Sequence, residues 1–192
     1  DNIQNVYGLP CVVAINRFPT DTEAELELIE SECQKLGVNV KLSEVWAKGG
    51  EGALDLADEV MRLIEQPSEL KFAYEDGADV ADALEAVATK VYRADGVDFT
   101  PAAKRQLAEL RENGFGNLPV CVAKTQYSFS DNAKALGAPE NFRITVRELK
   151  VSAGAHFVVA LTGNVLTMPG LPKVPAAENI DVDNDGNITG LF

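Results

Sequence analysis

The chain has 192 residues, of which 46% are hydrophobic and 24% charged, so it can bury one good hydrophobic core or two small ones and is not expected to be disordered. Its formal net charge of -13 comes from 17 basic and 30 acidic side chains and would repel phosphate, which argues against nucleic acid or an anionic membrane as a partner. The longest apolar segments are too short to span a bilayer. We therefore expect a soluble globular protein, in which a local basic pocket for a small anion is still allowed.

The few cysteines and the single histidine argue against a metal site. Cys11, Cys33 and Cys121 lack Cys-x-x-Cys spacing and lie in apolar patterns, which favours reduced, buried thiols and a cytoplasmic location. His156 lies in an apolar strand pattern and is expected to be packed rather than catalytic. The first residues, DNIQNVYGLP, lack the basic and apolar regions of a signal peptide and read like part of a longer chain.

The first third of the chain predicts two strand and helix pairs. VVAI (12–15) is typical of a buried strand. A helix over 20–36 follows, because Thr20 and Glu23 have capping-box spacing and Gly37 is placed to end it. VNVKL (38–42) alternates as a second strand. A strand, helix and strand in this order imply parallel strands joined by a right-handed crossover.

The segment SEVWAKGGEG (43–52) is predicted to be a polar, Gly-rich loop that leads into a helix over 53–66. The apolar residues of that helix fall on one face: Leu56, Val60 and Ile64. The sequence QPSEL then interrupts the pattern, so a domain boundary is expected between Gln66 and Lys71. A single merged core is the open alternative.

The remainder predicts a second α/β unit. Helices are expected over 76–93 and from the Thr100-Pro101 capping pair to Gly114, followed by a strand in LPVCVA (118–123). From residue 142 the chain is rich in β-branched residues, Gly and Pro, which predicts two or three strands and an extended tail. The fold class is therefore α/β, with parallel-strand βαβα units and a strand-rich C-terminal segment.

Aromatic residues occur in the loops that follow the predicted strands. Ligands of open α/β sheets bind at the carboxyl ends of the strands, and the loops NRFPTD, SEVWAKGGEG and KTQYSFSD carry Phe18, Trp46 and Tyr127. Aromatic faces hold a flat heterocycle by offset stacking, worth about 0.5 to 1.5 kcal/mol per pair beyond burial. The alternative for each ring is that it covers the edge of a core.

A nucleotide site is a second, weaker interpretation. The stretch AINR resembles the guanine-reading strand of GTPases through Asn16, but Pro19 stands where the base-reading carboxylate belongs. No GxxxxGK[ST] phosphate loop is present. The amides of AKGGEG, with Lys48, Gly49 and Gly50, could contact an anion, although a flexible turn is the better explanation of this segment alone.

Two further motifs have plain alternatives. Lys124 ends a predicted strand and is a candidate anion contact, or else a solvated surface lysine. The tail DVDNDGNITGLF has Asp181, Asp183 and Asp185 at calcium-loop spacing, but Phe192 stands where the loop needs a bidentate Glu. We therefore expect a hairpin-like turn at Asn-Asp-Gly and no bound calcium.

Four segments together resemble one enzyme family. VVAINRFPTDTEAEL, SEVWAKGGEGALDLA, CVAKTQYSFSDN and the run from FRITVRELK to the final ITGLF are similar, in order and spacing, to the C-terminal portion of formate–tetrahydrofolate ligase. The resemblance covers essentially all of the chain. It implies that residues 1–68 are the end of an α/β nucleotide- and folate-binding domain and that 69–192 form a C-terminal α/β domain.

The resemblance also implies a reaction and a site. ATP phosphorylates formate to formyl phosphate, and the formyl group passes to N10 of tetrahydrofolate, giving ADP and phosphate. The matching positions for the aromatic pair that sandwiches the pterin are Phe18 and Trp46, with Pro19 and Leu42 lining the same pocket. The family is also expected to respond to monovalent cations and to form cytoplasmic homo-oligomers.

The family's phosphate loop has no counterpart in these residues, so we expect no catalytic group in this chain and no turnover by it alone. Small molecules, namely folate, formate and ATP, are the expected partners. The alternatives from other classes are a degenerate nucleotide-binding module and a noncatalytic assembly domain.

Overall fold

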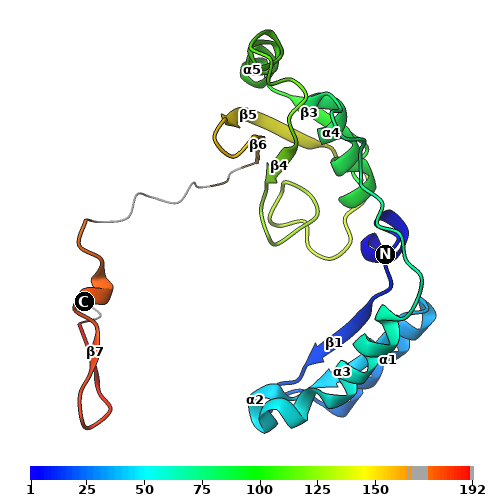
Figure 1. Cartoon of the computed structure of the whole chain (residues 1–192), viewed down its shortest axis with the longest axis vertical. Coiled ribbons are helices and arrows are strands. Elements are labelled where there is room, and N and C mark those ends of the chain that lie inside the picture. The colour runs from blue at the N-terminus through cyan, green and yellow to red at the C-terminus, as the bar shows by residue number, and fades with distance from the viewer. Residues whose placement is uncertain (164, 166–172, 191–192) are drawn as a thin grey trace.

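The computed structural model describes residues 1–163, 165 and 173–190, and its fold class is α/β, as predicted. Figure 1 shows β1 and α1 to α3 at one end of the molecule and β3 to β6 with α4 and α5 at the other. Within the described ranges, no helix has the length and apolar character that a bilayer crossing requires. The proposed boundary near residue 68 stays a prediction.

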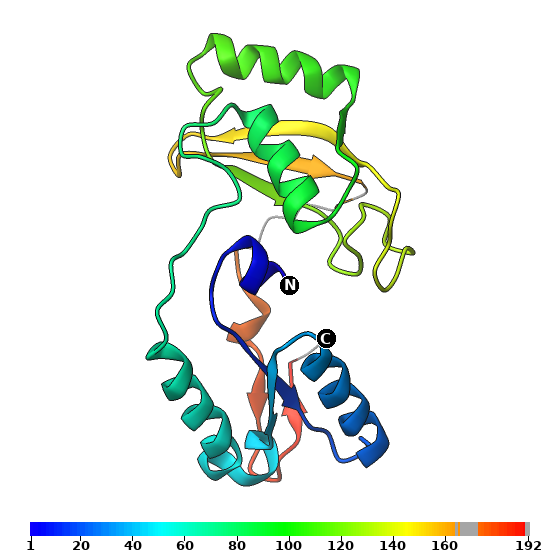
Figure 2. The ribbon, with the colours of Figure 1, turned by 90° about the vertical axis from the view of Figure 1, so that its right-hand side faces the viewer.

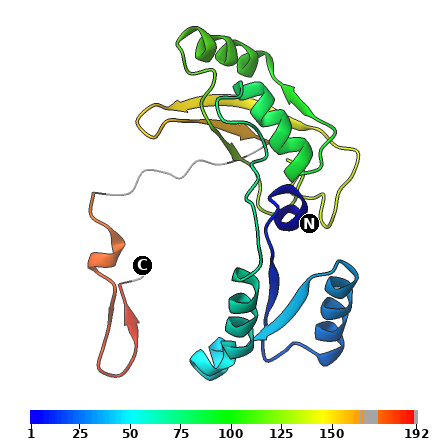
Figure 3. The same ribbon diagram turned by 45° about the vertical axis from the view of Figure 1, so that its right-hand side comes forward.

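The first region is built around two parallel strands. Its elements are η1 (Asn2–Val6), β1 (Val12–Asn16), α1 (Glu23–Lys35), β2 (Asn39–Ser43), α2 (Val45–Lys48), η2 (Gly49–Ala53) and α3 (Leu54–Ile64). Strands β1 and β2 are parallel, with Val12 opposite Asn39 and Asn16 opposite Ser43, so the predicted strand, helix and strand unit is confirmed. Figure 3 shows α1 and α3 on either side of the strand pair. Both strands end at the same edge of their sheet.

Helix α1 begins later in the chain than predicted. Its N-cap is Thr22, whose hydroxyl accepts a hydrogen bond from the Glu25 amide at 3.4 Å, while the Glu25 carboxylate accepts one from the Thr22 amide at 2.8 Å. The bonds that the Thr22 amide and hydroxyl donate to the Glu25 carboxylate hold the pKa of that carboxyl below its usual value. The Thr20 and Glu23 capping box was therefore wrong, although the spacing of the motif was correct.

A turn before the helix explains the difference. The Asp21 carboxylate accepts a hydrogen bond from the Phe18 amide at 2.7 Å, and the Asp21 amide donates to the Phe18 carbonyl at 3.0 Å. These two bonds close a turn around Pro19 and Thr20, which keeps Thr20 outside the helix. The backbone of Phe18 is held by the same turn.

The segment predicted to be a polar loop after β2 contains two short helical elements, α2 and η2. The Glu44 amide donates to the Gly52 carbonyl at 2.9 Å, which brings the two backbones together. A Cβ at residue 52 would lie 2.5 Å from the Glu44 carbonyl carbon and oxygen, so the close approach requires glycine. The Gly-rich sequence therefore makes a compact structure rather than a flexible turn.

A buried carboxylate links β2 to α3. Glu59 accepts hydrogen bonds from Arg62 Nη2 at 2.6 Å and from Asn39 Nδ2 at 2.8 Å. The Arg62 bond, reinforced by that from Asn39, lowers the pKa of the Glu59 carboxyl to about 2. Of the residues predicted to share the apolar face of α3, Leu56 is half-buried, whereas Val60 and Ile64 are exposed.

The second region contains a mixed four-stranded sheet. Its elements are α4 (Val80–Ala86), η3 (Val87–Val91), β3 (Val97–Phe99), α5 (Pro101–Glu112), β4 (Val120–Ala123), β5 (Ile144–Ser152) and β6 (Phe157–Thr162). The strand order is β3-β5-β6-β4, with β3 parallel to β5, β4 parallel to β6, and β5 antiparallel to β6. Figure 2 shows α4 crossing in front of these strands. The predicted helix start at Thr100 and Pro101 is confirmed.

The main hydrophobic core belongs to this second region. Its buried members include Val80 and Leu84 of α4, Leu107 of α5, and Val146 and Val158 of the sheet. Between residues 1 and 70, by contrast, the buried hydrophobic side chains are Leu26 and Val38, and neither is fully enclosed. The first region therefore leaves much of its apolar surface uncovered.

Two predictions of burial were wrong. His156 is exposed in the turn between β5 and β6, with a positive φ of 59°, because the apolar pattern resumes only after it. Cys121 is exposed, while Cys11 and Cys33 are half-buried; all three are free thiols. The absence of a disulfide framework among them agrees with the sequence interpretation.

The tail forms a small hairpin where Asn-Asp-Gly predicted one. After η4 (Ala176–Glu178), strands β7 (Asp181–Val182) and β8 (Ile188–Thr189) pair antiparallel. The Asp183 carboxylate accepts hydrogen bonds from the amides of Asp185 and Asn187 at 2.9 and 2.8 Å, which stabilise the turn. Part of the expected extended segment, and Phe192 of the calcium-loop comparison, lie outside the described residues.

Replacing each of the two threonines before α1 by alanine tests the observed cap. Thr22→Ala removes the N-cap hydroxyl and should lower the free energy of unfolding by about 1 kcal/mol in urea titrations. Thr20→Ala is the matched control and should have a much smaller effect, since Thr20 lies outside the helix. A larger loss from Thr20→Ala would show that the helix starts where the sequence pattern alone placed it.

Candidate functional site

Two large aromatic side chains lie exposed where β1 and β2 end. Phe18 follows β1 and is 58% exposed; Trp46 lies in α2 just after β2 and is 76% exposed. Pro19 is exposed and Leu42, near the end of β2, is half-buried. Both aromatic rings are therefore largely exposed to solvent.

The pairing of the strands places these residues at one edge of the sheet. Beyond the Asn16 and Ser43 pair, the Arg17 amide still donates a hydrogen bond to the Ser43 carbonyl at 3.1 Å. The segments that follow β1 and β2 therefore separate only after Arg17. Within the described residues, the aromatic rings close enough to interact are those of Tyr92 and Phe129, with centroids 6.4 Å apart. Phe18 and Trp46 do not pack on each other.

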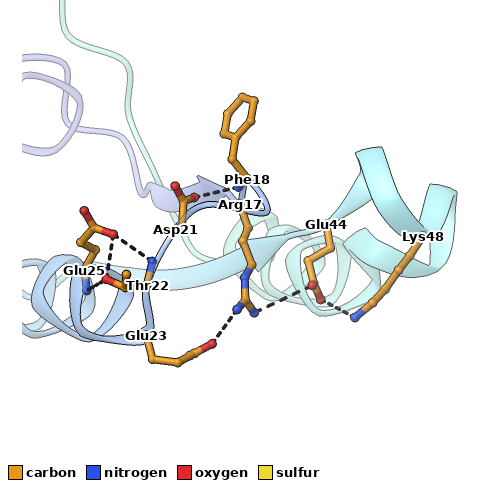
Figure 4. Close-up of polar contacts among 8 residues, drawn as sticks. All are labelled: Arg17, Phe18, Asp21, Thr22, Glu23, Glu25, Glu44 and Lys48. Atoms are coloured by element: carbon orange, nitrogen blue, oxygen red, sulfur yellow. Dashed lines mark hydrogen bonds and ion pairs between the residues drawn. The ribbon is translucent and has the colours of Figure 1, made fainter.

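An ion-pair network connects the two loops below Phe18 (Figure 4). The Arg17 guanidinium lies 2.5 Å from a Glu23 carboxylate oxygen and 4.0 Å from one of Glu44, and Lys48 Nζ lies 2.5 Å from the other Glu44 oxygen. The hydrogen bond from Lys48 lowers the pKa of the Glu44 carboxyl, and the charge of Arg17 contributes to this. Sequence reasoning missed Arg17 and Glu44, although opposite charges directly after two neighbouring strands were a usable signal.

Of the residues considered for a nucleotide or anion near this edge, Lys48 already has a partner of opposite charge. Lys48 is paired with Glu44, and Gly49 and Gly50 form the start of η2. Asn16 is exposed at the end of β1, close to the same edge. The geometry provides no cluster of uncompensated positive charge among these residues, and their anion contacts stay predictions.

Lys124 lies far along the chain from this edge and organises its own loop. Its ammonium group donates to the carbonyl oxygens of Thr125 and Ser130 at 3.0 Å each and to that of Ser128, and lies 4.9 Å from the centre of the Tyr92 ring. An ammonium group has three donor hydrogens, so these carbonyls account for all of them. Burial lowers the pKa of Lys124. This arrangement favours a structural role over an anion contact.

Two cavities flank the Lys124 loop. One, of about 440 Å³, is lined by Tyr92, Tyr127 and Phe129 among others, and the second, of about 760 Å³, is lined by Tyr127, Lys134 and Arg147 among others. Tyr127 borders both and was the third aromatic that the sequence placed at a strand end. The candidate pair Phe18 and Trp46, by contrast, stands on an open surface.

No group of three or more His, Cys, Asp or Glu side chains is placed to hold a metal ion in the part of the chain that the structure describes. A monovalent cation site, which the family resemblance implies, therefore has no assigned ligands here. It stays a prediction.

Comparison with known families identifies the chain. The sequence model of formate–tetrahydrofolate ligase matches residues 1–192. The chain belongs to this family. The resemblance predicted from the four sequence segments is thus confirmed over the whole length. The family's enzymes are ligases of one-carbon metabolism that act on formate and tetrahydrofolate and use ATP, so the strand-end aromatics belong to a protein whose relatives bind a flat heterocycle.

The role of Lys124 can be tested by Lys124→Met, which keeps the unbranched shape of the side chain up to its last carbon and removes the donors. The carbonyls of Thr125, Ser128 and Ser130 would lose a partner, and we expect the free energy of unfolding in urea to fall by about 1 to 3 kcal/mol. Hydrogen exchange should also accelerate over residues 125–131.

Lys134→Met is the matched control, because Lys134 is exposed in the same segment, and it should change stability little. The opposite outcome would be that Lys124→Met leaves stability unchanged, while inorganic phosphate stabilises the wild-type chain and not the variant. The anion interpretation would then replace the structural one.

Proposed function

We propose that this chain supplies the folate-binding wall of a formate–tetrahydrofolate ligase. Phe18 and Trp46 stack on the two faces of the pterin, and Pro19 and Leu42 line the same slot. The full reaction converts formate, ATP and tetrahydrofolate to 10-formyltetrahydrofolate, ADP and phosphate.

The observation that carries the proposal is the parallel pairing of β1 with β2, which starts the Phe18 and Trp46 loops at one sheet edge. Neighbouring strands are about 4.8 Å apart, whereas rings on both faces of a flat ligand are roughly 7 Å apart, because carbon atoms in contact are separated by about 3.5 to 4.0 Å. Two loops that diverge slightly after adjacent strands suit this separation. The exposure of both rings supports a slot that opens to solvent.

The wall contributes to catalysis by orientation. Transfer of a formyl group requires N10 of the folate beside the acyl phosphate in a fixed geometry, and holding two reactants in place lowers the barrier without a reactive side chain. The chain contains no phosphate-loop motif, so binding and activation of ATP are assigned to residues outside this sequence. Cytoplasmic location and homo-oligomer formation stay predictions.

A noncatalytic assembly domain is the second candidate, and one observation favours it. Helix α3 exposes Leu54, Val60, Met61 and Ile64, and contiguous exposed apolar side chains on a soluble protein mark interaction surfaces. In that case the aromatics at the strand ends would pack against a protein partner. The degenerate nucleotide module is less favoured, because Lys48 is neutralised by Glu44.

Tetrahydrofolate should quench the fluorescence of Trp46. Trp46 is the single tryptophan of the chain, so the signal comes from the proposed slot alone. Phe18→Ala should weaken binding about 2- to 12-fold, the equivalent of one lost aromatic pair. The measurement is a fluorescence titration with tetrahydrofolate and, separately, with ATP.

Phe72→Ala is the matched control, since Phe72 is also exposed and its neighbour Lys71 is bonded to Tyr7, which precedes β1, and it should bind folate as the wild type does. Quenching by ATP rather than folate would favour the nucleotide module. If the fluorescence of Trp46 does not respond to either ligand but changes with protein concentration, assembly is favoured and the folate slot is overturned.

We also expect no 10-formyltetrahydrofolate when the purified 192-residue chain is mixed with formate, ATP, magnesium and tetrahydrofolate. Product would be measured by chromatography, with a complete ligase of the family as the positive control. Turnover by the chain would mean that it contains phosphate-handling residues that we have not assigned.

A further inference from the structure

Arg17 occupies the junction between the two loops that carry the aromatic rings. It directly precedes Phe18, and its guanidinium contacts Glu23 in the first turn of α1 and Glu44 just before α2. The side chains of Arg17 and Glu44 are 30% and 25% exposed, so this pair is less solvated than most surface ion pairs. Figure 4 shows the Arg17 side chain on the opposite side of the loop from the Phe18 ring.

The partner of Arg17 on the second loop is itself firmly held. The Glu44 carbonyl accepts hydrogen bonds from the Ala47 and Lys48 amides at 3.0 and 2.9 Å, so Glu44 begins the helical turn that contains Trp46. Its amide is bound to the Gly52 carbonyl, and its carboxylate is bound to Lys48. A displacement of the Glu44 side chain would therefore also move the backbone that carries Trp46.

The first loop is held in a similar way. The Arg17 amide continues the strand pairing to Ser43, and the Phe18 amide is bound by Asp21. These backbone bonds do not fix the distance between the Phe18 and Trp46 loops beyond the last strand pair. The Arg17 side chain is the described group that joins α1, the Phe18 loop and the Trp46 turn.

We infer that Arg17 is a positioning residue for the pterin slot: by bridging Glu23 and Glu44 it fixes the distance and tilt between Phe18 and Trp46. This inference rests on the proposed function, because it presupposes the pterin slot. It assigns Arg17 no contact with the ligand. The bridge prepares the open slot before folate arrives, which lowers the ordering cost of binding. It depends on charge, so it weakens as salt screens the pair.

The test is a double-mutant cycle in folate affinity, using Arg17→Gln, Glu44→Gln and the double variant in the 192-residue chain. Arg17→Gln should weaken tetrahydrofolate binding about fivefold, measured by Trp46 quenching, which is about 1 kcal/mol. The double variant should bind no more weakly than Arg17→Gln, because the two groups act through one contact. Lys35→Gln, which breaks an exposed pair with Glu32 on α1, is the control and should bind as the wild type does.

A salt series distinguishes positioning from general stabilisation. In about 1 M salt, the wild type should lose affinity and approach Arg17→Gln, while melting temperatures of all variants stay within a few degrees. Equal affinity of wild type and Arg17→Gln, or strictly additive losses in the cycle, would overturn the role of Arg17 and leave the folate slot intact. Failure of the wild-type chain to bind folate would instead overturn the proposed function.

Discussion

Strands β1 and β2 run in the same direction with Asn16 opposite Ser43, so the chain leaves this sheet twice at one edge. Everything proposed for the site follows from that register. Side chains alternate along a strand, and a slip of one residue would turn Leu42 to the opposite face and shift the start of the Trp46 turn relative to Phe18. The carboxylate of Glu59, bound to Asn39 at the beginning of β2, helps to hold the strand against α3.

Two of the positive charges in this protein organise its own loops. Lys124 gathers the carbonyls of a single loop around one ammonium group, whereas Arg17 joins carboxylates from two different elements. The first arrangement shapes one segment, and the second sets the spacing between two. With a net charge of -13, the field around the chain disfavours an anionic ligand, which is consistent with a wall that binds the aromatic part of a substrate.

The two regions bury their apolar side chains unequally. The second region has a continuous core between α4, α5 and the mixed sheet, centred on residues such as Leu84 and Val158. The first has a two-stranded parallel sheet, and α3 exposes Val60, Met61 and Ile64. Parallel sheets are normally covered on both faces, so this region presents apolar surface on which a partner element could pack. That surface is the observation behind the alternative of an assembly domain.

Much of this fold could be predicted from the sequence, because element type depends on local periodicity and capping chemistry. The strands at 12–15 and 38–42, the helix start at Thr100-Pro101 and the hairpin at Asn-Asp-Gly were all correct, and so was the placement of Phe18 and Trp46 after neighbouring strands. The start of α1 was not, since two Thr-x-x-Glu pairs compete there and only the turn closed by Asp21 selects Thr22.

The tertiary structure decided what each side chain does. Exposure of Val60 and His156 depends on which surfaces meet, and the roles of Lys124 and Arg17 depend on acceptors that folding brings within reach. A hydrophobic or charged residue type specifies what it can contact, but not what will be near it. The sequence alone therefore determined the family and many of the elements, and it placed Phe18 and Trp46 after neighbouring strands. The ion-pair bridge near them required the fold, because its members come from three separate segments.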